Sequence, residues 1–157
     1  MKIELVLNTV ATTWEISPGE TLLEALRRFG CLSVKRGCET GDCGACTVLL
    51  DNEPVNACVV AAGRVRGHMV TTLEGLQADP LMNRLQAAFV AGGAIQCGYC
   101  TPGMLLSTYA LLKEGKEAKD DAVRDALSGN LCRCTGYLKP VQAVLAVWED
   151  MAREGDS

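Results

Sequence analysis

The sequence is poor in histidine and in long apolar runs, and each shortage excludes a class of protein. His68 is the single histidine among 157 residues. A Rieske iron–sulfur centre and a zinc site of the two-cysteine, two-histidine type each need two histidines, so both are excluded. No apolar run approaches the length of about 18 residues that a membrane span requires. Residues 1–7 lack the longer apolar core and the cleavage site of a secretory signal, so we expect a cytoplasmic protein outside the membrane.

An excess of positive charge is also missing. The chain has 19 acidic and 15 basic side chains, which gives a formal net charge of −4. Nucleic acids and anionic membrane surfaces attract positively charged proteins, so we expect neither as a partner. A chain of 157 residues, 48% of them hydrophobic, is long enough for one ordinary domain or two small ones, each with a buried core.

Cysteine, by contrast, is abundant. Nine cysteines in a chain without a secretory signal point away from disulfides and toward metal or redox chemistry. Eight of them fall into two groups of four: Cys38, Cys43, Cys46 and Cys58, then Cys97, Cys100, Cys132 and Cys134. Cys31 belongs to neither group, and we interpret it as a small buried apolar residue rather than as a ninth ligand.

The first group has the spacing of a plant-type ferredoxin. Residues 36–48 read Arg-Gly-Cys-Glu-Thr-Gly-Asp-Cys-Gly-Ala-Cys-Thr-Val, and a fourth cysteine follows at position 58. Cys-x4-Cys-x2-Cys with a distant fourth cysteine is the plant-type pattern for a [2Fe–2S] cluster. Gly37, Gly41 and Gly44 would let the backbone wrap closely around a negatively charged cluster and form an anion-binding nest. A four-cysteine zinc site is the alternative, but the loop lacks two separated Cys-x2-Cys pairs.

The second group consists of Cys97-x2-Cys100 and, after 31 further residues, Cys132-x-Cys134. A single residue between two cysteines is outside the usual zinc spacing of two to four residues. The spacing therefore favours a second iron–sulfur cluster, with zinc as the alternative.

The N-terminal half predicts a β-grasp ferredoxin domain over residues 1–76. Alternation in residues 2–7 predicts a strand, and a second short strand passes through Trp14 and Ile16. Thr21 and Glu24 form a capping box for a helix that directs Leu22, Leu23, Leu26 and Phe29 inward and stops at Gly30. We expect further strands over residues 47–50, 55–60 and 68–72, with Cys58 in the second of these.

The C-terminal half predicts a small helical domain over residues 77–157, so the fold class is α+β. Four helices are expected to form a bundle, with their cysteines at helix ends and in loops. The first begins near Pro80 and the second is capped by Thr101. The third is capped by Asp120 or Asp121 and terminated by Gly129 and Asn130, and the fourth spans residues 141–151.

Three stretches together resemble the xanthine oxidase family of molybdenum hydroxylases. They are residues 37–48, residues 96–103 (Gln-Cys-Gly-Tyr-Cys-Thr-Pro-Gly) and residues 129–137 (Gly-Asn-Leu-Cys-Arg-Cys-Thr-Gly-Tyr). All three occur in the family's order and spacing, and the resemblance covers nearly the whole chain. The chain is similar to the small iron–sulfur subunit of a heteromeric family member.

The resemblance implies two [2Fe–2S] clusters, one on each group of four cysteines, with the helical-domain cluster nearer the molybdenum. It implies that Gln96 and Cys134 approach the molybdopterin of a partner subunit. Electrons from hydroxylation of the substrate with water at molybdenum would pass through the helical-domain cluster and then the ferredoxin-domain cluster to FAD or another acceptor. This chain would then be the non-catalytic iron–sulfur subunit of an oxidoreductase.

The partners implied by the resemblance are a molybdenum-binding large subunit and an FAD-binding medium subunit, arranged as a dimer of heterotrimers. Residues 33–48 are similar overall to bacterial xanthine dehydrogenase small subunits, which favours a purine or related N-heterocycle as substrate. Two alternatives stay open from the sequence: a free-standing two-cluster ferredoxin, and a structural module with two four-cysteine zinc sites.

Overall fold

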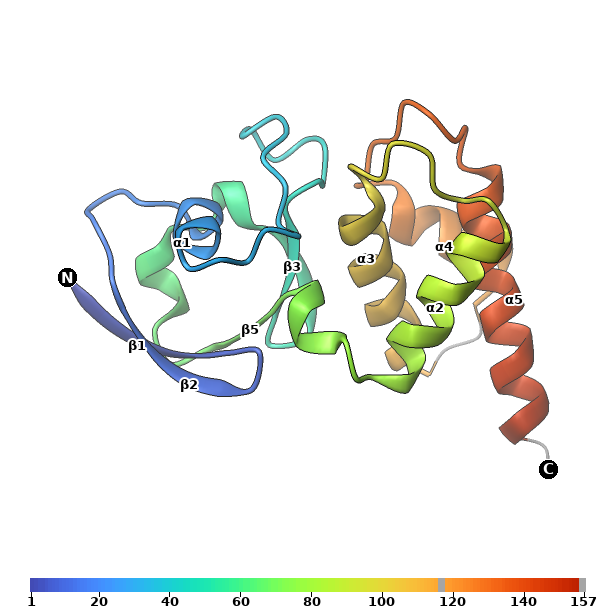
Figure 1. Ribbon diagram of the computed structural model, residues 1–157, viewed down its shortest axis with the longest axis horizontal. Helices are drawn as coiled ribbons and strands as arrows, with labels where there is room; N and C mark the ends of the chain where they lie inside the picture. The colour runs from blue at the N-terminus through green and yellow to red at the C-terminus, as the bar shows by residue number, and fades with distance from the viewer. Residues whose placement is uncertain (116–117, 156–157) are drawn as a thin grey trace.

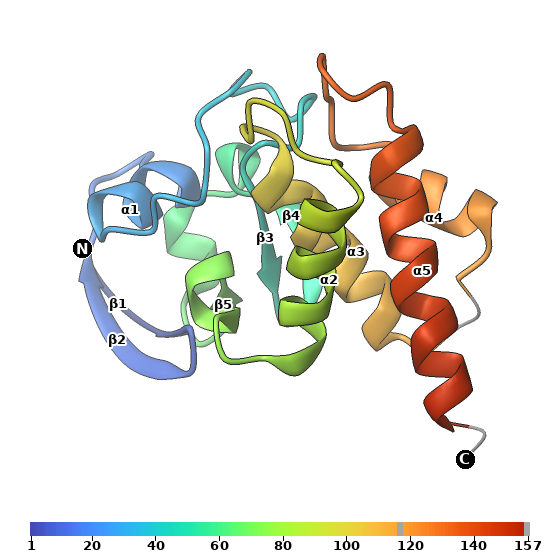
Figure 2. The same ribbon diagram turned by 45° about the vertical axis from the view of Figure 1, so that its right-hand side comes forward.

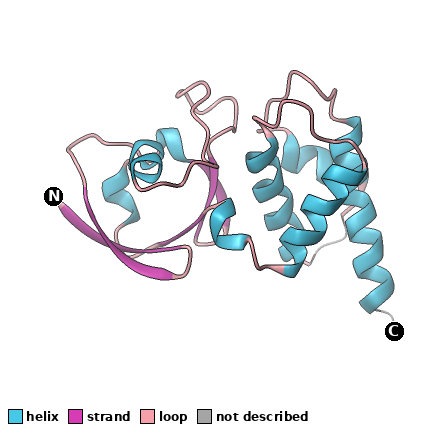
Figure 3. Cartoon of the chain, viewed as in Figure 1, coloured by secondary structure: helices cyan, strands magenta, loops and turns pink. Residues whose placement is uncertain are grey.

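The computed structural model describes residues 1–115 and 118–155. Figure 3 shows that the strands gather in one half of the molecule and the long helices in the other. The main elements are β1 (Lys2–Leu7), β2 (Val10–Glu15), α1 (Leu22–Arg28), β3 (Thr47–Leu50), β4 (Glu53–Asn56), β5 (Met69–Thr71), α2 (Pro80–Ala91), α3 (Thr101–Lys113), α4 (Asp120–Leu127) and α5 (Leu138–Gly155). Short 3-10 helices are η1 (Ala57–Val59), η2 (Ala62–Val65) and η3 (Leu73–Leu76).

The sheet is mixed and has the strand order β2-β1-β5-β3-β4. β1 is antiparallel to β2 and parallel to β5, and β3 is antiparallel to both β4 and β5. α1 buries Leu22, Leu23 and Leu26 in the same core as Ile3 and Trp14 of the sheet. This arrangement confirms the predicted β-grasp domain (Figure 1).

The start of α1 is the predicted capping box. Thr21 Oγ1 accepts a hydrogen bond from the Glu24 amide at 3.2 Å, and the Glu24 carboxylate accepts one from the Thr21 amide at 2.8 Å. The prediction that Phe29 points inward is wrong. α1 ends at Arg28, so Phe29 lies outside the helical periodicity, is 41% exposed and stacks on Trp14 with ring centroids 4.9 Å apart.

The prediction that Cys58 lies in a strand over residues 55–60 is also wrong. Asp51 and Asn52 both adopt positive φ, 50° and 72°, and form a two-residue turn. The strand therefore starts earlier, at Glu53, and its pairing ends where Asn56 meets Thr47, the first residue of β3. Cys58 consequently lies in η1.

The helical half contains the four predicted helices, α2 to α5. The expected inward residues Leu81, Leu85 and Phe89 of α2 are all buried. Two predicted caps are displaced by one residue, because α3 begins at Thr101 with Cys100 as its N-cap and α4 begins at Asp120 with Lys119 as its N-cap.

The last helix starts at Leu138 rather than at residue 141, directly after Gly136 and Tyr137, which have positive φ. It is also longer than predicted and reaches Gly155 instead of ending at residue 151. Within the described residues, no helix is long and apolar enough to cross a membrane.

β3 contributes side chains to the cores of both halves. Successive residues of a strand face opposite sides of the sheet. Val48 is fully buried in the core of the β-grasp half, whereas Leu49, 2% exposed, is buried in the core of the helical half. Figure 2 shows α3 lying beside β3 and β4. The two halves therefore pack through the face of the sheet that α1 does not cover.

Candidate metal centres

Seven of the eight grouped cysteines lie in three loops at one end of the molecule, at the top in Figure 1. These loops connect α1 to β3, α2 to α3, and α4 to α5, and Cys58 joins them from η1. A pocket of about 230 Å³ lies between the loops. Six of the grouped cysteines line it: Cys38, Cys43, Cys97, Cys100, Cys132 and Cys134.

In the first group, backbone amides surround the sulfur of Cys38. The amides of Thr40, Asp42 and Cys43 donate to Cys38 Sγ at 3.4, 3.3 and 3.3 Å, and the Cys38 amide donates to Cys43 Sγ at 3.4 Å. The side-chain and backbone hydrogen bonds from Thr40, with the other amides, lower the pKa of Cys38 to about 6. Cys38 is therefore largely a thiolate near neutral pH, which is the form that binds metal.

The other two cysteines of the first group are buried. Cys46 is 2% and Cys58 is 7% exposed. Burial raises the pKa of Cys46 to about 12, since Cys46 lies against the Cys58 side chain away from water. Metal binding at Cys46 must therefore displace a proton that neutral pH alone would not remove.

The three glycines of the loop serve in two ways. Gly41 and Gly44 have φ of +86° and +66°, a conformation that L side chains rarely adopt. Gly37 does not have positive φ, but a Cβ at this position would lie 2.5 Å from Cys43 Sγ. The absence of a side chain at Gly37 thus leaves room for the sulfur of Cys43. Within the described residues, the backbone amides that donate to sulfur are those of Cys38, Thr40, Asp42 and Cys43, and not those of the three glycines.

The second group has an exposed pair and a half-buried pair. Cys97 and Cys134 are exposed, and their sulfurs are 3.7 Å apart. Cys100 and Cys132 are half-buried and contact each other, and burial raises the pKa of Cys100 to about 12. Burial also acts to raise the pKa of Cys132, but hydrogen bonds from Thr135, whose hydroxyl is 3.2 Å from the sulfur, outweigh it and lower this pKa.

The grouped cysteines lie in pairs, and their sulfurs do not converge on one point. The side chains of Cys46 and Cys58, of Cys97 and Cys134, and of Cys100 and Cys132 contact each other, whereas the amides of Cys38 and Cys43 each donate to the other's sulfur. Across residues 1–115 and 118–155, no three His, Cys, Asp or Glu side chains are grouped so as to hold a single metal ion. A structural zinc ion needs four ligands around one point, whereas a [2Fe–2S] cluster offers two irons to four cysteines. The paired donors fit the two-iron group.

Gln96 and Cys134 lie side by side at the exposed edge of the second group. The Gln96 side chain donates a hydrogen bond to the Cys134 carbonyl at 3.1 Å. Both residues are exposed, and so are the apolar side chains of Leu131 and Leu138, at 56% and 55%. This edge of the second group therefore presents polar and apolar contacts to solvent.

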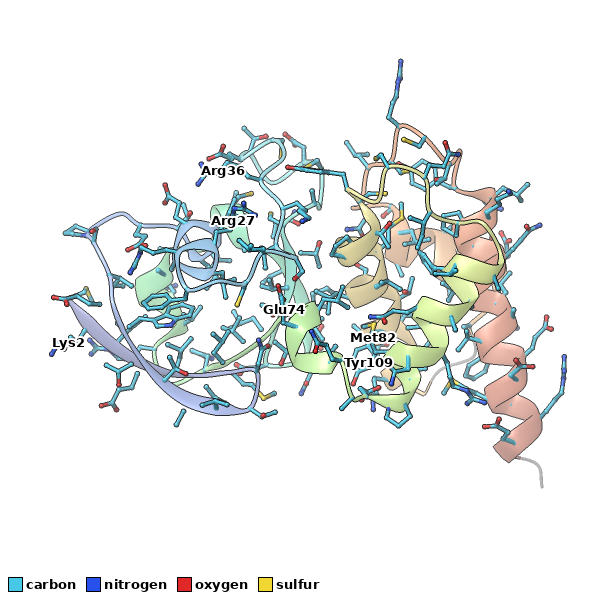
Figure 4. All side chains as sticks on the ribbon, in the orientation of Figure 1. Lys2, Arg27, Arg36, Glu74, Met82 and Tyr109 are labelled. Carbon is cyan, nitrogen blue, oxygen red and sulfur yellow. The ribbon has the colours of Figure 1, made fainter. Side chains whose placement is uncertain are left out.

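Residues that the sequence reasoning did not single out for this role join the two cysteine groups. Tyr99 donates its hydroxyl to the carbonyl of Arg36 at 2.5 Å, and the Leu131 amide donates to the Cys43 carbonyl at 2.8 Å. Figure 4 places Arg36 on the loop that leads into the first group. Asn130, expected only to end a helix, is 2% exposed and donates to the Gly44 carbonyl at 3.0 Å. The one available signal was its place inside the stretch 129–137.

Cys31 lies outside both groups, as expected. It is 5% exposed and packs in the core of the β-grasp half. Burial raises the pKa of its thiol, which therefore stays protonated at neutral pH.

A β-grasp half and a four-helix half, each with four cysteines paired for a two-iron cluster, define a two-domain iron–sulfur protein. Residues 5–68 match the family described as 2Fe-2S iron-sulfur cluster binding domain, and residues 72–145 match the [2Fe-2S] binding domain family. The chain belongs to the small [2Fe–2S] subunits of the molybdenum hydroxylase family. It is an electron-transfer subunit, and its family partners carry the molybdenum cofactor and FAD.

Two relatives and one solved structure illustrate the similarity. The chain is 47% identical over 143 residues to the nicotinate dehydrogenase small FeS subunit of Eubacterium barkeri, covering 90% of this chain and 91% of that one. It is 42% identical over 145 residues to the xanthine dehydrogenase iron-sulfur-binding subunit of Escherichia coli O157:H7, covering 91% of each. The crystal structure of quinoline 2-oxidoreductase from Pseudomonas putida 86 matches with a TM-score of 0.90 and 38% identity, covering 100% of this chain and 98% of that chain.

Proposed function

We propose that the eight paired cysteines are the ligands of two [2Fe–2S] clusters in a molybdenum hydroxylase complex. The first cluster would be held by Cys38, Cys43, Cys46 and Cys58, and the second by Cys97, Cys100, Cys132 and Cys134. The arrangement of the cysteines in pairs carries this assignment. A [2Fe–2S] cluster bound here supplies one-electron redox chemistry. The residues of this chain hold the sulfurs, shield the inner pairs from water and connect the two groups.

We propose that electrons enter at the second group and leave at the first, as in the family that this chain belongs to. Cys97 and Cys134, with Gln96 beside them, form the accessible edge of the second group, where we place the molybdopterin of the partner subunit. From the inner pair, the backbone runs from Cys132 to Leu131, whose amide donates to the Cys43 carbonyl of the first group. This connection is continuous through covalent and hydrogen bonds.

The exit lies at the rim of the first cysteine loop. Glu39, Thr40 and Asp42 are exposed there, next to Cys38. We assign these residues to the contact with the acceptor subunit. FAD is the acceptor that we propose, because the family's partner subunits carry it.

The substrate that we assign to the complex is a purine or another N-heterocycle. Nicotinate, xanthine and quinoline, named in the descriptions of the relatives at 47%, 42% and 38% identity, are all N-heteroaromatic compounds. Aldehydes form the competing class, because an aldehyde oxidoreductase of Desulfovibrio desulfuricans is 41% identical and an aldehyde oxidoreductase subunit of Escherichia coli O157:H7 is 37% identical.

For the assembly we propose a dimer of heterotrimers that contain this chain, a molybdenum-binding large subunit and an FAD-binding medium subunit. The relatives include small subunits of several oxidoreductases, which supports a multi-subunit complex.

For the compartment we propose the cytoplasm. It suits nine free thiols, because its reducing conditions keep cysteines available for metal. We place the domain boundary between residues 76 and 77, after η3.

Purification of the native complex tests the proposal. We expect a brown preparation with charge-transfer absorption, iron and acid-labile sulfide in equal amounts, and molybdenum and flavin on co-purifying chains. The complex is then mixed with a panel of purines, pyridines, quinolines and aldehydes. The substrate is the compound that bleaches the iron–sulfur absorption by reducing the clusters. A colourless zinc protein, or a chain that elutes alone, would contradict the proposal. Molybdenum without flavin would preserve the family assignment and change only the electron exit.

A further inference from the structure

Asn130 lies between the two cysteine groups and contacts both sides. Its side-chain amide donates to the Gly44 carbonyl at 3.0 Å and to Thr47 Oγ1 at 3.1 Å, and its side-chain oxygen accepts from Ser107 Oγ at 2.8 Å. Gly44 lies between Cys43 and Cys46, whereas Asn130 precedes Cys132 by two residues. Ser107 is in α3, which begins directly after Cys100. One buried side chain thus connects segments adjacent to ligands of both groups.

The backbones around Asn130 approach so closely that no side chain fits between them. A Cβ at Gly44 would lie 2.1 Å from the Gly129 carbonyl oxygen, and a Cβ at Gly103 of α3 would lie 2.4 Å from the Gly44 carbonyl oxygen. This close backbone contact and the three hydrogen bonds of Asn130 together fix the position of the first cysteine loop against the helical half.

The chemistry of the site suits asparagine. Two acceptors, the Gly44 carbonyl and the Thr47 hydroxyl, face the amide nitrogen, and one donor, the Ser107 hydroxyl, faces the oxygen. Thr47 donates its own proton to the Gly44 carbonyl at 2.7 Å, so its oxygen is free to accept. Aspartate would place a carboxylate against the Gly44 carbonyl, and an apolar residue would leave buried polar groups unpaired.

We propose that Asn130 is a positioning residue that fixes the separation and orientation of the two clusters and thereby sets the rate of electron transfer between them. This inference rests on the proposed cluster ligands. With both clusters bound, one electron would pass from the reduced second cluster to the oxidised first cluster, with no other reactant. Because electron tunnelling slows steeply with distance, a small displacement of the Gly44 segment changes the rate without removing any ligand.

The main test compares Asn130→Ala with Thr108→Val in the purified complex. Thr108 is a matched control because it is fully buried in the same half and, among the described residues, its hydroxyl donates to the Met104 and Leu105 carbonyls of its own helix. For Asn130→Ala we expect both reduced-cluster signals in paramagnetic resonance. Their mutual magnetic splitting should be reduced or lost, and transfer to the acceptor after substrate addition should be slower. Thr108→Val should retain the splitting and the rate of the unmodified complex.

Two further variants separate positioning from helix stability. Gly103→Ala keeps Asn130 and favours α3, since alanine is the better helix former, but its methyl group wedges against the Gly44 carbonyl. We expect weaker magnetic splitting and slower transfer despite the better helix. Thr47→Val keeps the shape of the side chain, removes one acceptor of Asn130 and should change the splitting less, in the same direction.

The outcomes distinguish the two proposals. An unmodified complex without two iron–sulfur signals would overturn the ligand assignment itself. The positioning role alone would be overturned by a second result. In that result the unmodified complex shows magnetic splitting, and both the splitting and the transfer rate stay the same in Asn130→Ala and Gly103→Ala. If Asn130→Ala does not accumulate as a complex, Gly103→Ala and Thr47→Val decide the question by the same two readouts.

Discussion

At the scale of single residues, the absence of a side chain shapes the first site as much as the thiols do. Gly37 precedes the ligand candidate Cys38, and the nearest atom to a Cβ at Gly37 would be Cys43 Sγ. Real Cβ atoms essentially never approach another atom to 2.5 Å, so any substitution must displace this sulfur or its backbone. The position therefore tolerates glycine alone while the sulfur stays in place.

We predict that Gly37→Ala removes the first cluster and spares the second. Displacing one sulfur leaves three ligands for the first group, whereas the second group is untouched, so about half of the iron should be lost. Iron analysis and paramagnetic resonance of the reduced protein measure this result. Gly63→Ala is the control, because the nearest atom to its Cβ would be 3.8 Å away. Equal iron content in both variants would contradict the prediction.

Local chemistry explains which residues could be predicted from the sequence. The capping box of Thr21 and Glu24 joins residues three apart, and the cysteine spacing within residues 36–48 restricts what the loop can bind. Asn130 and Tyr99 instead contact residues 86 and 63 positions away. No local pattern reveals such a partner, because the contact exists only once the two halves have packed together.

At the scale of elements, η3 is attached to the β-grasp half by a carboxylate. Glu74 accepts hydrogen bonds from the Ser33 amide at 2.8 Å, the Ser33 hydroxyl at 2.6 Å and the Thr72 hydroxyl at 2.6 Å. Figure 4 shows Glu74 on the segment between the halves. Partial burial acts to raise the pKa of Glu74, but these hydrogen bonds outweigh it and hold this pKa below its usual value.

We predict that Glu74→Gln lowers the thermal unfolding midpoint at pH 7 and that the difference shrinks in acid. A carboxylate with a depressed folded-state pKa stabilises the fold above its unfolded pKa, about 4.3, and loses this contribution as the pH falls through the folded pKa. Midpoints of both proteins measured from pH 7 downward give the comparison. Glu15→Gln, at an exposed site, serves as control. A difference that is independent of pH would refute the role of the charge.

The elements also show where the sequence-based prediction failed. The largely apolar composition of residues 55–60 suits a strand, but the pairing partner β3 is only four residues long and ends the ladder at Asn56. Phe29 continues the apolar periodicity of α1 and yet lies one residue past its end. The strand boundary was decided by β3, which is not encoded within residues 55–60, whereas the helix ends next to Gly30, which has a φ of 90°.

At the scale of the whole molecule, the two proposed clusters would form a path that electrons enter at the second group and leave at the first. Cys43 lies at the middle of this path, because its sulfur belongs to the first group and its carbonyl accepts the Leu131 amide from the second. A change at Cys43 should therefore interrupt the path without altering the entrance.

We predict that Cys43→Ser leaves the second cluster reducible by substrate and abolishes transfer to the acceptor. Paramagnetic resonance of the substrate-reduced complex should show one reduced cluster, and acceptor reduction should fall to background. Cys31→Ala is the matched control, since this buried cysteine lies outside both groups and its loss should preserve both signals. Two normal cluster signals in Cys43→Ser would disprove the ligand assignment.

Because β3 belongs to the cores of both halves, it affects the order of folding and cluster delivery during synthesis. Proteins fold from the N-terminus during synthesis, so Val48 finds its core while Leu49 still faces water and Asn130 has not left the ribosome. The first cysteine group is then complete, and its Gly44 side is open until Gly129 and Asn130 pack against it. We expect cluster delivery to begin on this half-made chain, which iron analysis of ribosome-bound chains arrested near residue 110 would reveal. Iron found only on released full-length chains would reverse that order.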